Sequence, residues 1–157
     1  MSMTVTDSIR GMLEGLGIAY KYLEHAPTRT SEESAAARGE PLEIGAKALL
    51  VKVGDEFRLF VLSAARKLDS NAVKQRFGVK KVRFASAEEL WELTGLVPGS
   101  VPPFGRPILP FDLAVDARVE ELERVAFNAG LLTASIVMSR SDYMRAAQPG
   151  LVFAFSE

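Results

Sequence analysis

The sequence predicts an α+β fold built on a mixed, largely antiparallel β-sheet with helices packed outside it. Three observations favour this class. Strand-like runs outnumber helical ones, hairpin signals are frequent, and the helical segments fall between the strands without strict alternation. The chain of 157 residues is expected to fold as one domain, because that length is typical of a single hydrophobic core.

Helices are expected where a capping side chain precedes an apolar or alanine-rich run. Such a side chain accepts a hydrogen bond from a free backbone N–H group of the first turn. The expected helices, each with its cap, are residues 6–16 (Thr6 or Asp7), 31–38 (Thr30 with Glu33), 70–77 (Asp69), 87–94 (Ser86 with Glu89) and 143–147 (Ser139 with Asp142).

Strands are expected where β-branched and aromatic residues cluster between turn signals. Two pairs of runs are joined by short turn segments, one at Gly54-Asp55 and the other at Ala129-Gly130. The expected strands are residues 18–23, 46–53, 57–62, 79–84, 108–115, 125–128, 131–138 and 151–155.

A stiff loop is expected over residues 95–110, which hold three glycines and five prolines. Prolines restrict the backbone, while glycines let it turn sharply and approach a ligand closely. Such a loop can present backbone N–H and C=O groups to a small polar ligand, and long ordered loops in compact domains are usually functional. The alternative is a segment that only connects two elements.

Composition narrows the possible chemistry. The chain has no cysteine and one histidine, His25, which excludes thiolate metal sites, thiol nucleophiles and multi-histidine metal centres. No metal or cofactor is expected. No apolar run approaches the roughly 20 residues of a membrane helix, and residues 1–10 are polar. We therefore expect a cytoplasmic protein that does not attach to a membrane.

Charge is unevenly distributed along the chain. Residues 66–83 hold seven basic residues and one acid, a net charge of +6, whereas the remainder carries −7. A local contact with phosphate groups would account for this segment. From charge alone, a solvated helix and an edge strand protected from aggregation by lysines are the better interpretation.

Two single residues could carry chemistry. His25 would be the base of a Ser-His-Asp triad, but the Gly-x-Ser-x-Gly turn that presents a serine nucleophile in one such class is absent. A structural or substrate-contacting histidine is the better interpretation. Lys47 begins an apolar strand, where it would neutralise a phosphate or a developing oxyanion, or else extend its amine out to solvent.

Several segments, in order along the chain, resemble the YbaK/prolyl-tRNA-synthetase-associated family of tRNA editing domains. The resemblance extends over about residues 20–155. The matching segments are Thr-Arg-Thr-Ser-Glu-Glu at 28–33, Ala-Lys-Ala-Leu-Leu-Val at 46–51, Leu-Thr-Gly at 93–95 and Gly-Ser-Val-Pro-Pro-Phe-Gly at 99–105. Arg-Lys-Leu-Asp at 66–69 and Phe-Asn-Ala-Gly-Leu at 127–131 also lie where the family would place them.

The resemblance implies a free-standing aminoacyl-tRNA deacylase. Such proteins hydrolyse the ester that joins a wrong amino acid to the 3′-terminal adenosine of a tRNA, in a cleft between the lysine strand and the Gly/Pro loop. Lys47 is then expected to act at the oxyanion or at the terminal phosphate. The residues expected to contact the substrate are His25, Thr30, Gly99, Ser100, Pro103, Gly105 and Asn128.

The partner implied by the resemblance is tRNA, through its aminoacylated 3′ end and acceptor stem. A synthetase or an elongation factor could deliver it. The residues expected to contact its phosphates are Arg66, Lys67, Lys74, Arg76, Lys80 and Lys81. Relatives that edit alanine can carry asparagine after the lysine, and those that edit cysteine can carry threonine. Here that residue is Ala48, which suggests a roomier pocket and a modestly broad specificity.

Two other functions stay open at this point. A module that binds tRNA or a synthetase without chemistry would show salt-sensitive affinity and no turnover. A deacylase of small aminoacyl esters would have a turnover rate that depends neither on the tRNA body nor on the basic residues of the protein's 66–83 segment.

Overall fold

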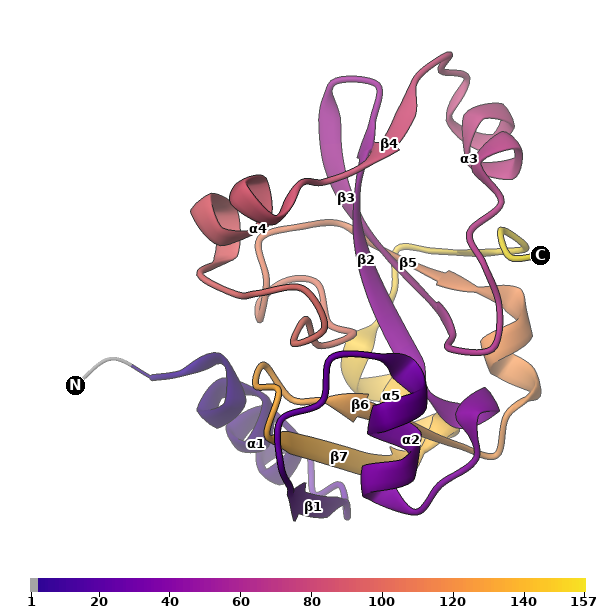
Figure 1. Ribbon diagram of the computed structural model, residues 1–157. Coiled ribbons are helices and arrows are strands. Elements are labelled where there is room, and N and C mark those ends of the chain that lie inside the picture. Colours follow the sequence, from indigo (N-terminus) through magenta and orange to yellow (C-terminus); the bar gives the residue numbers. More distant parts are fainter. Residues whose placement is uncertain (1–2) are drawn as a thin grey trace.

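The eight strands of the computed structural model, which describes residues 3–157, form two sheets (Figure 1). The smaller sheet has the order β1-β7-β6 and the larger the order β4-β2-β3-β5-β8. The strands are β1 (Lys21–Glu24), β2 (Ala46–Val53), β3 (Glu56–Ser63), β4 (Val82–Phe84), β5 (Leu113–Asp116), β6 (Arg124–Asn128), β7 (Ala134–Ser139) and β8 (Leu151–Phe153).

Most strand pairs are antiparallel, as the sequence predicts. Parallel pairing is confined to β3 with β5 and β5 with β8 in the larger sheet. The division into two sheets is a finding that the sequence pattern did not indicate. The sheets meet at an isolated parallel bridge between Gly45, just before β2, and Ala126 in β6.

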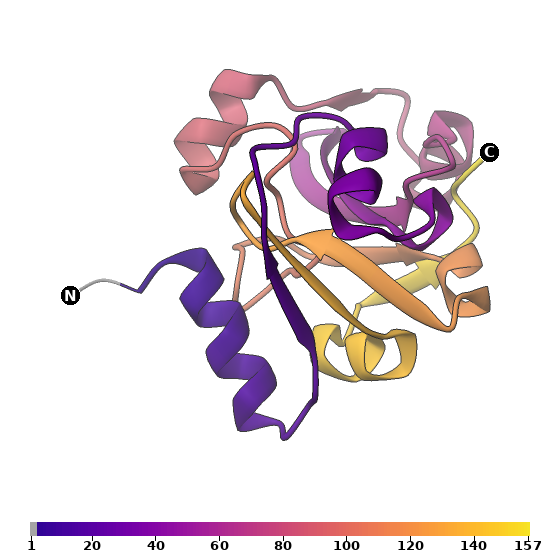
Figure 2. The same cartoon turned by 60° about the horizontal axis from the view of Figure 1, so that its bottom comes forward.

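The helices lie outside the sheets. They are α1 (Val5–Gly15), α2 (Ser31–Arg38), α3 (Ser70–Phe77), α4 (Ala87–Thr94) and α5 (Arg140–Ala147), with short 3-10 helices η1 (Leu42–Ile44) and η2 (Ala117–Glu121). Figures 1 and 2 show α2 and α5 on opposite sides of the smaller sheet. None of the described helices is long and apolar enough to cross a bilayer.

A capping side chain starts each of these five helices, and four of the five caps are the predicted ones. Thr30, Asp69, Ser86 and Ser139 cap α2, α3, α4 and α5 as predicted. The expected cap of the first helix is wrong. There Thr4 accepts a hydrogen bond from the backbone of Asp7 and the Asp7 carboxylate approaches the Thr4 N–H, so the capping box lies two residues earlier. Thr6 is buried and donates to the carbonyl of Ala129 at 2.6 Å.

Several strands are shorter than the sequence predicts, because turns occupy their expected ends. The run 79–84 becomes a strand only at Val82, since the Val79 N–H caps α3 by bonding to the Lys74 carbonyl. The run 108–115 begins pairing at Leu113, because the N–H groups of Ile108 and Leu109 both bond to the Gly105 carbonyl. The runs 18–23, 131–138 and 151–155 are trimmed or shifted by up to three residues, whereas β2 spans residues 46–53 as expected.

The larger sheet is buried on both faces, which fixes the position of β2. One face packs with the smaller sheet, α1 and the 95–110 loop in a core that includes Ile9, Phe104 and Phe127. The other face packs beneath α3 around Val73 and Phe60. Since residues of a strand point alternately to its two faces, β2 is held firmly in register, with its first residues at the junction of the two sheets.

Candidate active site

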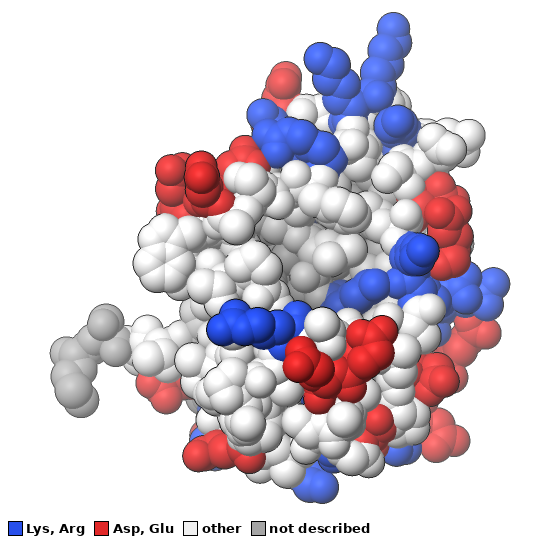
Figure 3. Space-filling view, viewed as in Figure 1, with Lys and Arg blue, Asp and Glu red and all other residues white. Residues whose placement is uncertain are grey.

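A cavity of about 180 Å³ opens where β2 begins. Its walls come from α2, the first residues of β2, the end of β6 and the Gly/Pro loop, segments that are far apart in the sequence. Figure 3 shows one hollow in the middle of this face, with basic side chains above it and on both sides of its lower rim. Lys47 and Gly99 both line this cavity, so the lysine strand and the loop meet as expected.

The amine of Lys47 is a half-buried cation on the cavity wall. Its Nζ donates to the backbone carbonyl of Arg66 at 2.6 Å, and no ion pair joins it to a carboxylate within the described residues. Burial lowers the pKa of Lys47; Glu32 opposes this shift and Lys67 adds to it. An ammonium group has three donors, so two remain for an anion in the cavity.

Asn128 ties the end of β6 to the loop. Its Nδ2 donates to the Gly99 carbonyl at 2.6 Å, and its Oδ1 accepts from Arg38 at 3.0 Å. Gly99 has φ +89°, and a Cβ at this position would lie 3.3 Å from Leu132. The left-handed backbone therefore favours glycine here, and the loop passes close enough to Asn128 to be held by one side chain.

Arg38 is a site residue that the sequence analysis missed. Its guanidinium lines the cavity, donates to Ser135 Oγ at 2.9 Å and to Asn128, and forms no ion pair within residues 3–157. Burial lowers the pKa of Arg38 to about 10, partly offset by Glu40. A basic residue in the last turn of a helix normally serves only the helix dipole, so position alone gave no signal of this role.

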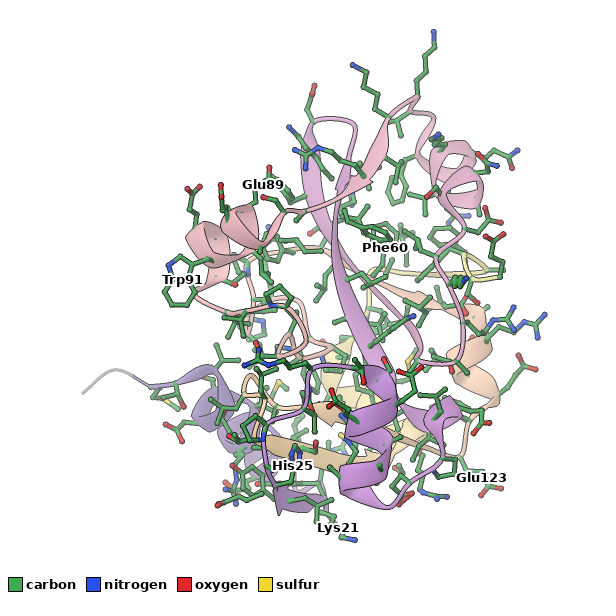
Figure 4. All side chains as sticks on the ribbon, viewed as in Figure 1. Lys21, His25, Phe60, Glu89, Trp91 and Glu123 are labelled. Atoms are coloured by element: carbon green, nitrogen blue, oxygen red, sulfur yellow. The ribbon has the colours of Figure 1, made fainter. Side chains whose placement is uncertain are left out.

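His25 follows directly after β1, in the lower part of the molecule in Figure 4, and is not among the residues that line the cavity. Its Nε2 is 2.8 Å from Ser135 Oγ, and its Nδ1 is 2.9 Å from the carbonyl of Ala26. Because that carbonyl can only accept, Nδ1 carries a proton, and in the neutral ring Nε2 accepts from Ser135. The Ser135 hydroxyl has one proton, so it can donate either to His25 Nε2 or to Asn128 Oδ1, which lies 3.1 Å from Ser135 Oγ. His25 is connected to the cavity through this network and does not line it.

Thr30 lines the cavity while capping α2. Apart from Gly99, the expected contacts in the loop do not line it, because their groups are engaged elsewhere. Ser100 is buried and exchanges hydrogen bonds with the backbone of Val97. The carbonyl of Pro103 accepts from the Tyr143 hydroxyl at 2.6 Å, and a Cβ on Gly105 would come within 2.6 Å of the Phe111 carbonyl. These contacts fix the shape of the loop and its packing against α5.

The six basic residues expected at tRNA divide between three places. Arg66 and Lys67 lie beside Lys47: the Arg66 carbonyl accepts from it, and the Lys67 charge acts on it. Lys74, Lys80 and Lys81 line a separate concavity at the far end of the β2–β3 hairpin, together with Lys52, Asp55 and Arg83. The guanidinium of Arg76 stacks over Phe153, 5.1 Å from the ring centre.

Comparison with known proteins decides the family. The model of the aminoacyl-tRNA editing domain matches residues 25–146, a range that contains every residue of the cavity wall. The chain belongs to this family. It is 34% identical over 146 residues to the multifunctional Ser/Thr-tRNA deacylase ProXp-y of Escherichia coli (strain K12), covering 90% of this chain and 87% of the relative. It is also 26% identical to the prolyl-tRNA editing protein ProX of Acetoanaerobium sticklandii, covering 90% of each chain.

Solved structures agree with this assignment of the fold. A crystal structure described as a candidate trans-editing enzyme for prolyl-tRNA synthetase superimposes with a TM-score of 0.82 and 26% identity, covering 100% of this chain and 99% of that one. The predicted family, the α+β fold and the predicted class of enzyme, a trans-editing deacylase of aminoacyl-tRNA, are thereby confirmed.

Proposed function

We propose that residues 1–157 act as one editing domain and that the cavity between Lys47 and Gly99 is where the ester of a mischarged tRNA is hydrolysed. The observation that carries this proposal is a half-buried ammonium group that has no carboxylate partner among residues 3–157 and faces the same cavity as a rigid loop. A cation held in this way is ready to stabilise negative charge that develops in the cavity.

The reaction needs no protein nucleophile. Water attacks the ester carbonyl carbon, the carbon–oxygen bond to the ribose breaks, and the products are the free amino acid and a tRNA with its terminal hydroxyl restored. Lys47 stabilises the oxyanion formed at the carbonyl, or the phosphate of the terminal nucleotide. The network of Arg38, Asn128 and Gly99 holds the loop against the substrate, so that geometry is fixed before the reaction begins.

Small side chains make up much of the cavity wall, and hydroxyl and amide groups lie among them, which favours a small hydroxylated amino acid. Thr30, Ser34 and Asn128 line the cavity, together with the small Ala48. The relative ProXp-y is named as a Ser/Thr-tRNA deacylase. We infer that seryl- and threonyl-tRNA are the first substrates to examine, with a difference of one methyl group only weakly discriminated.

The partners follow from the same reasoning. Electrostatic attraction to tRNA phosphates requires positive charge, which the cations near the cavity and those of the hairpin concavity supply. A segment of 101 residues is 35% identical to a proline–tRNA ligase of Shouchella clausii, although it spans only 18% of that enzyme. Delivery of the substrate by a synthetase is therefore a reasonable extension of the proposal, alongside delivery by an elongation factor.

A deacylation panel tests the function. One tRNA is charged in turn with serine, threonine, alanine, cysteine and proline, and release of each amino acid by the purified protein is followed under single-turnover conditions. We expect the fastest release of serine or threonine. Binding of tRNA without release of any amino acid would contradict hydrolysis and favour a binding module. Equal turnover of free aminoacyl esters and aminoacyl-tRNA would favour a small-ester deacylase.

A further inference from the structure

A second cavity adjoins the first along β2. It has a volume of about 150 Å³ and shares Ala48, Leu49, Gly99 and Val101 with the first cavity. Its remaining walls are mostly apolar, formed by Leu50, Leu90, Pro98 and the ring-bearing residue Phe84. This volume is below the roughly 300–1,000 Å³ of a pocket for a drug-sized ligand, so the cavity suits a single flat ring system.

Phe84 is the aromatic residue of this second cavity, and 57% of its surface is exposed. Its position is fixed by the junction of β4 and α4. Arg83 donates to both carboxylate oxygens of Glu89, at 2.8 and 2.9 Å, and to the Phe84 carbonyl at 3.2 Å. The N–H of Ala85 bonds to the Leu50 carbonyl at 2.9 Å. An exposed apolar ring on such a well-braced backbone is arranged to contact a ligand.

Positive charge lies beyond the second cavity, on the side away from Lys47. Strand β2 carries Lys47 at the first cavity and Lys52 at the basic concavity, five residues apart, which at about 3.3 Å per residue is roughly 16 Å. The order along the strand is therefore lysine cavity, apolar cavity, basic concavity. Proteins that bind single-stranded nucleic acid combine a basic groove for the backbone with aromatic rings on which bases stack.

We propose that the second cavity binds the terminal base at the single-stranded 3′ end of tRNA, with the base stacked on Phe84. This inference rests on the proposed function, because it places the ester of the same nucleotide in the first cavity. The base of a nucleotide is bonded directly to its ribose, so the two must lie in adjacent sites. The two cavities meet this requirement because they share a wall at Ala48 and Gly99. The preceding nucleotides then continue toward the basic concavity.

The binding of uncharged tRNA tests this subsite without any hydrolysis. The affinity of fluorescently labelled tRNA is measured for the wild type, Phe84→Ala and Phe84→Tyr, and again with tRNA lacking its terminal adenosine. Loss of one stacked base is worth about 1–3 kcal/mol, so Phe84→Ala should weaken binding of intact tRNA about fivefold or more. It should leave binding of the shortened tRNA unchanged, and Phe84→Tyr should restore binding of intact tRNA.

Trp91 provides a matched control. It lies on α4, 61% exposed, and points outward from the molecule in Figure 4 without lining either cavity. Trp91→Ala should therefore bind intact tRNA like the wild type. Equal affinity of Phe84→Ala and wild type for intact tRNA would overturn the inference, and so would an equal loss for both RNAs. A change confined to the choice between serine and threonine esters would assign the cavity to the amino acid instead.

The two proposals fail separately. If the wild type releases no amino acid but Phe84→Ala still loses affinity only for intact tRNA, the base subsite stands and hydrolysis is excluded. If hydrolysis is observed and Phe84 has no effect on binding, hydrolysis stands and the base lies elsewhere. Thermal unfolding of each variant confirms that the exposed substitution leaves the protein folded.

Discussion

Buried charge at the cavity is the dominant feature at the scale of single residues. Lys47 and Arg38 both lose hydration, and the pKa of each is lowered as a result. A charge that is removed from water interacts more strongly with any anion that replaces the water. The two residues differ in their partners: Lys47 donates to one backbone carbonyl, whereas Arg38 donates to two side chains of the site, Ser135 and Asn128.

Arg38 is therefore predicted to be a positioning residue. Arg38→Met removes the donors to Asn128 Oδ1 and Ser135 Oγ. Asn128 then loses its fixed orientation, and the loop loses the hydrogen bond from Asn128 to Gly99 that anchors it. We expect kcat/KM for deacylation to fall about tenfold, a loss of about 1.4 kcal/mol of transition-state stabilisation. Arg38→Lys should not restore it, because a single ammonium lacks the planar fork that reaches both acceptors.

A double-mutant cycle distinguishes this role from a direct contact with substrate. If Arg38 acts through Asn128, the combination of Arg38→Met with Asn128→Ala should be little worse than Asn128→Ala alone, with a coupling of about 0.5–3 kcal/mol. Strictly additive losses would show that Arg38 and Asn128 act independently.

At the scale of elements, local capping chemistry explains why so much of the secondary structure could be predicted. Thr30 with Glu33 and Ser86 with Glu89 form capping boxes within four residues of chain, so the signal and the structure that it produces lie together. The cap of α1 was misplaced because Thr4, Thr6 and Asp7 all have suitable side chains, and the burial of Thr6 against Ala129 depends on a segment 123 residues away.

The junction of β4 and α4 yields a pH prediction. Hydrogen bonds from Arg83, and then from the Ser86 backbone, lower the pKa of Glu89 from 4.5 to about 2. A carboxylate whose pKa is lower in the folded state stabilises the fold above the unfolded pKa and loses this effect as pH falls through the folded one. Between pH 4.5 and about 2, the wild type should therefore lose stability more steeply than Glu89→Gln.

Urea unfolding of both proteins across this interval measures the effect. Parallel pH dependences would show that the Glu89 carboxylate has the same pKa in the folded and unfolded states. Since Glu89 braces Phe84 through Arg83, Glu89→Gln should also weaken binding of intact tRNA if the second cavity holds a base.

At the scale of the whole molecule, the candidate site lies where the two sheets meet. Gly45 forms the bridge to Ala126 and accepts from the Ala64 N–H at 2.7 Å. A Cβ at Gly45 would lie 2.8 Å from the Ala64 Cβ, closer than two such atoms can pack. The cavity wall beside Lys47 therefore requires glycine for close approach.

Gly45→Ala should destabilise the protein by about 1–3 kcal/mol, the usual cost of overpacking. Gly11→Ala is the matched control, because Gly11 lies within α1 with open space at its Cβ. That change should stabilise by about 0.5–1 kcal/mol through helix propensity. Denaturant midpoints for the two variants check both signs, and equal midpoints would contradict the tight packing at the bridge.

Long-range contacts set the limit of what the sequence could predict about the site. Local patterns pointed to Lys47 and to the loop that contains Gly99, the family resemblance added Thr30 and Asn128, and all four line the cavity. Arg38 was missed because its partners Ser135 and Asn128 are 97 and 90 residues away. Ser100, Pro103 and Gly105 carried the right loop signal. However, Ser100 bonds to Val97, the Pro103 carbonyl accepts from Tyr143 of α5 and Gly105 packs against Phe111, so none of the three lines the cavity.

The central claim is that the Lys47 amine drives ester hydrolysis in this cavity, and one rate measurement tests it most directly. Single-turnover deacylation of seryl- or threonyl-tRNA is compared for wild type, Lys47→Ala and Lys21→Ala, the last an exposed lysine of β1 at the bottom of Figure 4. Removing one group that stabilises an oxyanion costs about 10²–10³ in rate. We predict that loss for Lys47→Ala alone, with an unchanged fold. A Lys47→Ala variant that hydrolyses its substrate at the wild-type rate would contradict the account.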